Sequence, residues 1–343
     1  MKTIIIPKPG EVKIIETPKP EAKEGEALLK VLRGGICGSD LGTYKGTFAY
    51  ASYPRIPGHE FSAQIVSLNG DASKYGLKEG MVVTCNPYFN CKKCYSCERG
   101  LVNCCEHNET LGAQRDGAFS EFITMPFDRI YDGKGLDPAE LAAIEPFCIS
   151  YHGTVTRGKV KKGDTVLVIG AGTIGALAAV AAKSQGAVVY IADVAQKKID
   201  YAVENFGLDG GIFNDGEHFI EKCFELTSGK GFDVAIEAVG LPATFQNAID
   251  AAAFGGRVVL IGVGKQNLDF NFTLLQKKEL NVFGSRNALK QDFLNLIDLV
   301  KSGKVNLKKA ITNTYSFDEA PKAFADFAAH GADMLKVEID FTR

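Results

Sequence analysis

One short segment constrains the fold of this chain more than any other. An apolar run, Thr165–Ile169, is followed directly by the glycine-rich turn Gly170–Gly175 and then by an alanine-rich stretch that continues to Gln185. This order is typical of a strand, a tight turn and a helix in a parallel α/β unit. The segment therefore predicts a parallel sheet in this part of the chain.

The turn itself reads Gly-Ala-Gly-Thr-Ile-Gly. Gly170 permits the tight turn, Gly172 lets backbone amides approach a pyrophosphate, and Gly175 lets the helix pack closely on the strand. Thr173 and Ile174 begin the helix, where free amide groups can bind an anion. The turn therefore predicts a site for a dinucleotide cofactor.

A second apolar run, Ala187–Ala192, ends at Asp193, 18 residues beyond Gly175. A carboxylate at this position can accept hydrogen bonds from the adenosine ribose and repels a 2′-phosphate. No arginine follows at once, although Lys197 and Lys198 are near. We therefore expect NAD rather than NADP. The alternatives are a flavin, which uses the same turn, and a glycine turn beside a surface aspartate that binds no ligand.

Later apolar runs continue the pattern and alternate with helical segments. They are Asp233–Ala238, Arg257–Ile261 and Leu280–Phe283. Strands that are apolar at nearly every residue, separated by helices, indicate a parallel sheet covered on both faces. Val239, Gly262 and Val263 follow two of these runs, and we include them among the candidate cofactor contacts.

The first part of the chain, to about residue 150, has a different pattern, in which Gly and Pro separate short β-branched runs. These runs are Thr3–Ile6, Val12–Ile15, Ala27–Leu32, Ala63–Leu68, Met81–Cys85 and Phe119–Thr124. They predict an irregular, largely antiparallel β domain. After about residue 285 we expect helices at Phe293–Lys301 and Pro321–Ala329 and a strand at Met334–Asp340. This tail is expected to return to the first domain.

The bulk properties exclude several classes of protein. A chain of 343 residues exceeds the size at which a single core stops growing, so two domains are expected. The formal net charge of -2 does not attract nucleic acid or anionic lipid, and no apolar stretch reaches the roughly 20 residues of a membrane span. The isoleucines before Pro7 are too few for the core of a signal peptide. We expect a cytoplasmic protein without nucleic-acid or membrane partners.

Five of the nine cysteines lie between residues 91 and 105. In a chain without an export signal, such crowding predicts metal binding rather than disulfides. Cys91, Cys94 and Cys97, with either Cys104 or Cys105, have spacings that let one short lobe (residues 86–107) surround a structural zinc ion. The metal would stabilise a lobe that has almost no core. The alternatives are an iron–sulfur cluster and a reduced cluster without metal.

A second set of metal-ligand residues is dispersed along the chain. Cys37, His59 and a carboxylate from Glu60 or Glu145 form an acceptable zinc site that leaves one position open. Each residue alone has a simpler interpretation. A buried cysteine is usually a small apolar core residue, a core histidine is usually hydrogen-bonded, and both glutamates could form ordinary ion pairs.

Together these motifs resemble the zinc-containing medium-chain dehydrogenases over essentially the whole chain. The motifs that occur in the order of that family are Cys37–Asp40, Gly58–Glu60, the four-cysteine lobe, Glu145–Pro146 and the glycine turn. The resemblance implies an α/β protein with a GroES-like β-rich catalytic domain, at residues 1–147 and 285–343. This domain is split around an NAD-binding Rossmann domain at residues 148–284. The family spacing favours Cys105 as the fourth ligand of the structural zinc.

The resemblance also implies roles for single residues. The expected ligands of a catalytic zinc are Cys37, His59 and either Glu60 or Glu145. Ser39 matches the hydroxyl that relays the proton of the alcohol, and Asp40 matches the partner that orients the zinc histidine. The implied chemistry is zinc acting as a Lewis acid on a secondary alcohol, whose hydride passes to NAD across the cleft between the domains.

Within the family, the sequence is most similar to the polyol branch, which includes sorbitol, threonine and galactitol-phosphate dehydrogenases. Asn103–Glu106, Asp116–Glu121 and Gly284–Asn287 resemble the members that act on the sugar acids L-galactonate and L-gulonate. Dehydrogenases of simple alcohols usually have cysteine where Glu145 stands. The absence of a cysteine at this position favours a polyol or sugar acid. Arg286 is expected either to hold a substrate carboxylate bidentately or to contact the cofactor or a substrate hydroxyl.

Several alternatives stay open. L-Threonine 3-dehydrogenase and a neutral polyol dehydrogenase are the other enzymes that fit. Outside enzymes, a non-catalytic protein that binds zinc and NAD is the alternative, although the intact Cys37, Ser39, His59 and Glu145 argue against it. The family implies a homodimer or a homotetramer, and no residue pattern decides between them.

Overall fold

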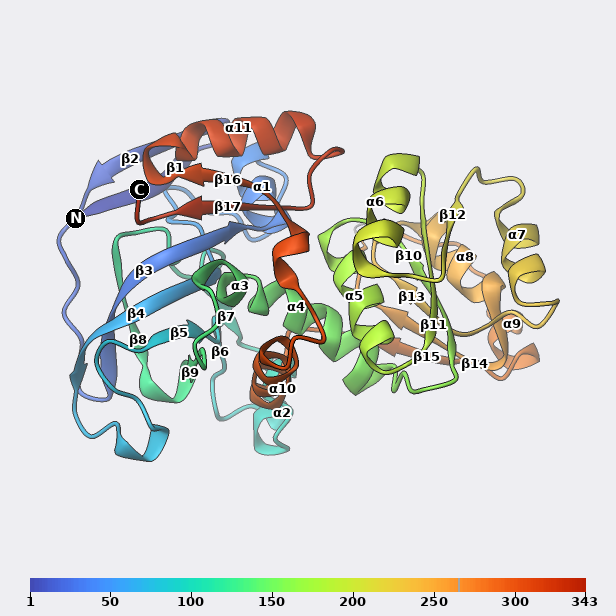
Figure 1. The fold of residues 1–343 in the computed structure, drawn as a ribbon, viewed down its shortest axis with the longest axis horizontal. Helices are drawn as coiled ribbons and strands as arrows, with labels where there is room; N and C mark the ends of the chain where they lie inside the picture. Colours follow the sequence, from blue (N-terminus) through green and yellow to red (C-terminus); the bar gives the residue numbers. More distant parts are fainter. Residues whose placement is uncertain (265) are drawn as a thin grey trace. The chain divides into compact units, whose positions relative to one another are not determined.

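The computed structural model describes residues 1–264 and 266–343, which form two compact units (Figure 1). Unit one comprises Met1–Glu145 and Leu289–Arg343, and unit two comprises Pro146–Ala288. The end of the chain therefore returns to the first unit, as expected for a split domain. In the described part of the chain, the helices are too short or too polar to cross a bilayer.

Unit two is built on a six-stranded parallel sheet (Figure 1). Its strands, in spatial order, are β12 (Gly210–Phe213), β11 (Val188–Asp193), β10 (Thr165–Ile169), β13 (Phe232–Glu237), β14 (Ala252–Leu260) and β15 (Asn281–Gly284). The first strand lies in the middle, and the chain builds the sheet first on one side of it and then on the other. This is the Rossmann order, with the point of reversal beside β10.

Helices cover both faces of this sheet. Val166 and Val168 of β10 belong to one apolar cluster, whereas Leu167 and Ile169 belong to another, because successive strand residues point to opposite faces. The helices α5 (Thr173–Ser184) and α6 (Gln196–Phe206) contribute to the first cluster, and α7 (Phe219–Leu226) and α8 (Pro242–Ala251) to the second. The prediction of a parallel sheet covered on both faces is confirmed.

Unit one is organised around a seven-stranded sheet (Figure 1). Its strands, in spatial order, are β16 (Ile311–Ser316), β17 (Lys336–Asp340), β3 (Glu26–Ile36), β4 (Glu60–Asn69), β5 (Val82–Cys85) and β9 (Ile130–Asp132), with β8 (Phe122–Pro126) also paired to β3. All pairs are antiparallel except β16 with β17. Because β17 pairs directly with β3, the last strand of the chain completes the sheet of its first part.

The remaining elements of unit one surround this sheet. Its two-stranded sheets are β1 (Lys2–Lys8) with β2 (Glu11–Glu16), and β6 (Tyr88–Phe89) with β7 (Glu109–Thr110). Its helices are α1 (Gly38–Lys45), α2 (Tyr95–Glu98), α3 (Pro138–Ala142), α10 (Lys290–Lys301) and α11 (Ala320–His330). The helix α4 (Ile144–Tyr151) begins in unit one and continues into unit two. Unit two also contains α9 (Thr273–Lys277).

The structure differs from the sequence-based strands in several places. The short strands β6, β7 and β9 were not predicted, and the strand predicted at Phe119–Thr124 lies at Phe122–Pro126. The strands at Gly210–Phe213 and Ile311–Ser316 were not predicted, because the first contains two glycines and the second is rich in half-buried polar residues. Both lie at the ends of their sheets, where such sequences are tolerated. The strand predicted from Arg257 begins at Ala252, and its register shifts beside Phe232.

Candidate active site and cofactor site

The register of β3 and β4 brings the dispersed ligand candidates together. Cys37 directly follows β3, and Glu60, the first residue of β4, pairs with Gly35. The Sγ of Cys37, a ring nitrogen of His59 and a carboxylate oxygen of Glu60 all lie within 4.8 Å of one another. A Cβ at position 35 would lie 2.2 Å from Oε2 of Glu60, so glycine is needed there to make room for the carboxylate.

Asp40 holds the backbone on both sides of this group. Its buried carboxylate accepts the amide of Cys37 at 2.9 Å and the amide of Gly58 at 3.2 Å. We expected Asp40 to orient His59, but among the described residues its hydrogen bonds go to these two amides rather than to the imidazole. The charge of Asp40 also raises the pKa of the His59 imidazole.

His59 has the surroundings of a metal ligand. Its ring is buried, and Nδ1 has no hydrogen-bond partner among the described residues, which is uncommon for a buried polar atom. Burial alone lowers the pKa of the imidazole, but the Cys37 thiol and the Asp40 carboxylate outweigh it and raise the pKa well above its usual value. The site thus favours positive charge, and its thiol, imidazole and carboxylate donors suit zinc.

Both candidate glutamates are already engaged by other side chains. Nζ of Lys336, the first residue of β17, lies 2.8 Å from Oε1 and 2.5 Å from Oε2 of Glu60. Glu145, on α4, accepts a hydrogen bond from the hydroxyl of Tyr88. Burial raises the pKa of Glu145 to about 7, although the charge of His59 lowers it. Glu60, but not Glu145, belongs to the group with Cys37 and His59, and both glutamates stay candidates for the third ligand.

Sequence analysis missed Lys336 and Tyr88. Lys336 lies in a strand whose charged and apolar residues alternate, a pattern that predicts a solvent-exposed charged face, yet all five residues of β17 are buried. Tyr88 lies on the two-residue strand β6, which is too short to show a periodic pattern. Ser39 lies where expected, near the start of α1 and half-buried, two residues after Cys37.

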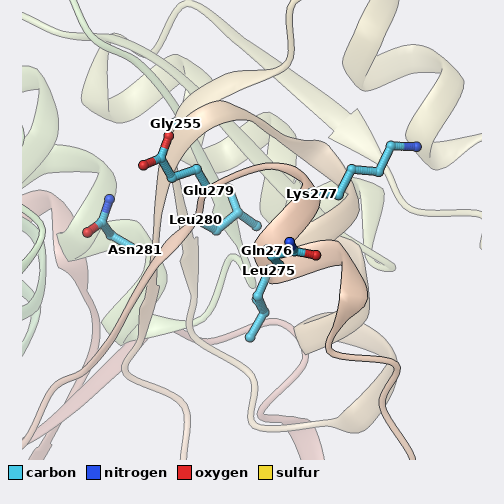
Figure 2. Close-up of a pocket in the computed structure, with 7 residues that line it drawn as sticks. All are labelled: Gly255, Leu275, Gln276, Lys277, Glu279, Leu280 and Asn281. Atoms are coloured by element: carbon cyan, nitrogen blue, oxygen red, sulfur yellow. The ribbon is translucent and has the colours of Figure 1, made fainter.

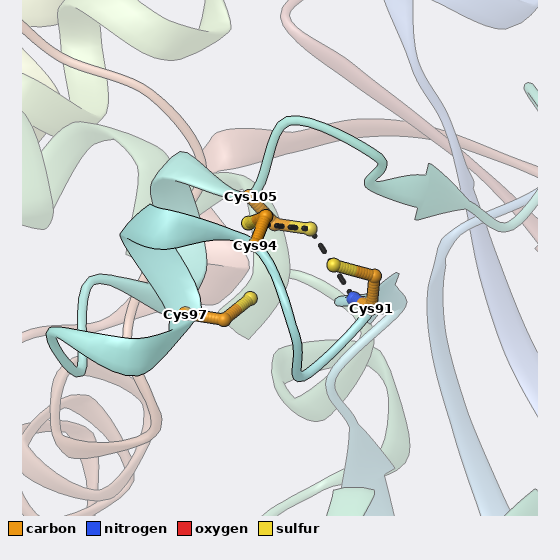
Figure 3. A group of neighbouring side chains, drawn as sticks. All are labelled: Cys91, Cys94, Cys97 and Cys105. Atoms are coloured by element: carbon orange, nitrogen blue, oxygen red, sulfur yellow. Dashed lines mark hydrogen bonds between the residues drawn. The ribbon is translucent and has the colours of Figure 1, made fainter.

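The sulfur atoms of four cysteines in the lobe lie close together. The Sγ atoms of Cys91, Cys94, Cys97 and Cys105 lie within 4.8 Å of one another (Figure 3). A tetrahedral zinc with bonds of about 2.3 Å requires sulfur atoms roughly 3.8 Å apart, and those of Cys94 and Cys105 are 3.9 Å apart. The amides of Glu106 and Cys97 lower the pKa of the Cys94 thiol to about 6. Cys104 is exposed and lies outside the group, which favours Cys105 as the fourth ligand.

In unit two, the glycine turn has the geometry that its predicted roles require. Gly170 has a φ of +105°, which favours glycine. A Cβ at Gly172 would meet nothing within 4 Å, so this side of the turn is open to a ligand, whereas a Cβ at Gly175 would lie 1.7 Å from the carbonyl oxygen of Gly170. Asp193, at the end of β11, accepts the amide of Ala171 at 2.7 Å and is thereby held against the turn.

The other cofactor candidates lie at the same edge of the sheet. Val239, Gly262 and Arg286 each follow a strand closely, and the carboxyl ends of parallel strands share one edge. Val263 is 80% exposed and Val239 42%, so this edge presents apolar side chains to solvent. Glu237, which sequence analysis missed, shapes the edge by accepting the amide of Val239 at 2.8 Å.

A hollow of about 800 Å³ lies elsewhere in unit two (Figure 2). It is lined by Gly255 and by residues 275–277 and 279–281, around α9 and the start of β15. None of the candidate cofactor residues contributes to its lining. The hollow therefore does not replace the glycine turn as the cofactor site.

Comparison with known proteins agrees with a fold of two domains that binds zinc and a dinucleotide. The model of the alcohol dehydrogenase GroES-like domain matches residues 23–134, and that of the zinc-binding dehydrogenase matches residues 173–302. The L-galactonate-5-dehydrogenase of Escherichia coli K12 is 33% identical over 341 residues, 99% of each chain. The chain belongs to the zinc-dependent medium-chain dehydrogenase family. The expected enzyme class, fold, zinc and nicotinamide dinucleotide are confirmed at the level of this family.

Further relatives place the chain in the polyol branch of the family. A sorbitol dehydrogenase of Halalkalibacterium halodurans is 32% identical over 331 residues, 96% of this chain and 95% of the relative. The crystal structure of an alcohol dehydrogenase from Escherichia coli CFT073, in complex with NADH, superposes with a TM-score of 0.90 at 31% identity and 99% coverage of both chains. The chain is therefore a family member over its whole described length.

Proposed function

We propose that this enzyme oxidises a secondary hydroxyl of a sugar acid, such as L-galactonate or L-gulonate, with NAD as the acceptor. The observation that carries the proposal is that ligand atoms of Cys37, His59 and Glu60 lie within 4.8 Å of one another. Glu145 matches a position that is usually cysteine in dehydrogenases of simple alcohols, which supports a polyol or sugar acid. The similarity to an L-galactonate-5-dehydrogenase supports the sugar-acid class. The similarity to a sorbitol dehydrogenase keeps a neutral polyol as the second candidate.

Different residues of the chain have separate roles in the proposed reaction. We assign Cys37, His59 and either Glu60 or Glu145 to a catalytic zinc, and the four cysteines of the lobe to a structural zinc. When bound, zinc supplies Lewis-acid chemistry and the nicotinamide accepts a hydride. Oγ of Ser39 takes the proton of the substrate hydroxyl and passes it toward solvent. Asp40 keeps the Cys37 and Gly58 backbones in place while this happens.

In unit two we assign the cofactor to the carboxyl edge of the sheet. The turn Gly170–Gly175, with Thr173 and Ile174 at the helix start, binds the pyrophosphate. Asp193 accepts the ribose hydroxyls, and its negative charge favours NAD over NADP. Val239, Gly262 and Val263 line the edge, and Arg286 contacts the cofactor or the carboxylate of a sugar acid.

A substrate screen tests this function. The zinc-loaded enzyme is assayed with L-galactonate, L-gulonate, L-threonine, sorbitol and xylitol, each with NAD and with NADP. The proposal predicts the highest kcat/KM for a sugar acid with NAD. Faster oxidation of L-threonine or of a neutral polyol would transfer the assignment to that class. Zero turnover across the panel, with both zinc ions present, would favour the non-catalytic alternative.

We also propose that the enzyme is a homo-oligomer, a dimer or a tetramer. Supporting this, β15 lies at the end of its sheet, and large apolar side chains are exposed at Val282 on β15, at Phe254 on the neighbouring β14 and at Phe272 before α9. An edge strand with apolar neighbours is a preferred surface for pairing with another chain. Sedimentation of the zinc-loaded protein should give two or four times the mass of one chain, and a monomer would contradict the proposal.

A further inference from the structure

The hydrogen bond from Tyr88 to Glu145 links the start of the lobe (residues 86–107) to the catalytic group. The hydroxyl of Tyr88 donates to Oε1 of Glu145, and both side chains are buried. Tyr88 lies on β6, three residues before Cys91 of the four-cysteine lobe. A hydrogen bond to a buried carboxylate is strong and directional, so the phenol determines where this oxygen lies.

Arg129 holds the backbone that carries Tyr88. Its Nη1 donates to the carbonyl of Tyr88, and its Nη2 donates to Oδ1 of Asn90 at 2.9 Å. Its guanidinium also lies over the ring of Phe89, with Cζ 4.5 Å from the ring centroid. One planar cation thus binds three consecutive residues, which restricts the position of the Tyr88 backbone.

Asn90 continues these contacts to the cysteines of the lobe. Its Nδ2 donates to Sγ of Cys97 at 3.6 Å, and the amide of the next residue, Cys91, donates to Sγ of Cys105 at 3.2 Å. A lobe of this size depends on its metal for its fold. Hydrogen bonds therefore connect Cys97 through Asn90 and Arg129 to the backbone carbonyl of Tyr88. The side chain of Tyr88 then connects this backbone to Glu145.

The two candidate glutamates are restrained by different partners. Lys336 binds both oxygens of Glu60, whereas Tyr88 donates to one oxygen of Glu145. The two partners come from distant parts of unit one, β17 and β6. A change at Tyr88 should therefore reach Glu145 without disturbing the ion pair of Glu60.

We propose that Tyr88 is a positioning residue for Glu145, and that the four-cysteine lobe acts on the catalytic group through the Arg129 contacts. The proposal rests on the proposed role of Glu145 beside the catalytic metal. It assigns the lobe a second role besides stabilising its own loop. Whether the lobe is folded around its metal then determines how precisely Glu145 is positioned.

A double-mutant cycle tests the first part. Tyr88→Phe, Glu145→Ala and the double variant are prepared with zinc in the lobe and Co²⁺ at the catalytic group. The visible absorption bands of Co²⁺ report its ligand geometry without any substrate, so the test stands even if the screened substrates are not turned over. Tyr88→Phe should shift these bands, and it should add no further shift in the Glu145→Ala background, where the hydroxyl has lost its acceptor.

Kinetics give the second readout of this cycle. Loss of a hydrogen bond to a charged group predicts about a 10-fold lower kcat for Tyr88→Phe in the otherwise unchanged enzyme, and no further loss in the Glu145→Ala background. Tyr75→Phe, which removes a hydroxyl from a ring packed on Phe127 with centroids 6.0 Å apart, is the matched control and should change neither readout. Equal effects of Tyr88→Phe in both backgrounds would overturn the positioning role.

Asn90→Ala tests the connection to the lobe. This variant removes the contacts of Asn90 with Arg129 and Cys97 and leaves the Tyr88 hydroxyl in place. It should shift the Co²⁺ bands in the same direction as Tyr88→Phe, by a smaller amount, while zinc in the lobe stays at one equivalent. Unchanged bands with the lobe fully loaded would overturn the role of the lobe.

Discussion

Lys336 places its Nζ 2.8 and 2.5 Å from the two carboxylate oxygens of Glu60. The side chains of both residues are almost completely buried, and 276 positions separate them in sequence. The ion pair joins β17, at the end of the chain, to the start of β4 beside Cys37 and His59. The return of the chain to unit one thus supplies a cation to the candidate metal site as well as a strand to the sheet.

The first prediction concerns this ion pair. Lys336→Met should destabilise the metal-free protein by about 3–5 kcal/mol, because it leaves the buried Glu60 carboxylate without a partner. Adding Glu60→Gln should recover most of this loss, since the uncompensated charge is then gone. Thermal unfolding of the metal-free variants at pH 7 measures both effects. A Lys336→Met variant as stable as the parent protein would show that the pair is not stabilising.

The second prediction concerns Glu338, two residues further along β17. Its carboxyl oxygens are buried and have no hydrogen-bond partner in the described part of the chain. Burial raises the pKa of Glu338 to about 8, against the charges of Arg33 and Lys336, which lower it, while Glu60 and Asp137 raise it. The carboxyl group is therefore neutral in the folded protein over a range in which it is ionised in the unfolded chain.

The sign of the pH dependence follows from this difference. Between the unfolded pKa of about 4.3 and the folded pKa of about 8, the folded protein retains a proton that the unfolded chain releases, so stability falls by up to about 1.4 kcal/mol for each pH unit. Glu338→Gln removes this loss. The variant should therefore gain thermal stability relative to the parent between pH 5 and pH 8, whereas a constant difference over this range would contradict the prediction.

The third prediction concerns the choice of cofactor. Asp193→Asn keeps an acceptor for the amide of Ala171 but removes the negative charge that repels a 2′-phosphate. Loss of charged hydrogen bonds to the ribose should lower the affinity for NADH by about 10-fold or more, and the affinity for NADPH should rise. Fluorescence titration with both dinucleotides gives the ratio, and an unchanged ratio would rule out Asp193 as its determinant.

The fourth prediction concerns Arg286, which is exposed and follows β15 by two residues. If its guanidinium holds a carboxylate, Arg286→Ala should raise KM for L-galactonate and L-gulonate by about 10- to 100-fold and leave KM for sorbitol nearly unchanged. Arg286→Lys, which keeps the charge but not the planar fork, should show a smaller increase. Equal increases for sugar acids and sorbitol would remove the carboxylate interpretation.

The sequence was sufficient for the features that depend on local chemistry. The glycine turn could be predicted because Gly170 and Gly175 occupy positions where a side chain is strained or excluded. The four-cysteine lobe could be predicted because its ligands lie within one short loop. The dispersed site required the family resemblance, since the pairing of Gly35 with Glu60 is visible only in the structure.

The features that sequence analysis missed are buried polar contacts between distant segments. Alternation of charged and apolar residues in β17 predicts that Lys336 and Glu338 face solvent, but the whole strand is buried. Tyr88 and Arg129 belong to short segments without periodicity, and their roles depend on partners 57 and 41 positions away. Such contacts follow from the tertiary fold and leave no local pattern.

The most direct test of the account is the metal content and turnover of Cys37→Ala. If Cys37 and His59 hold a catalytic zinc, this variant should bind one zinc per chain instead of two, lose turnover with every substrate, and still bind NADH. A matched Cys85→Ala variant, which removes a buried thiol outside both metal groups, should retain two zinc ions and its activity. Two zinc ions and undiminished turnover in Cys37→Ala would contradict the assignment of the catalytic site.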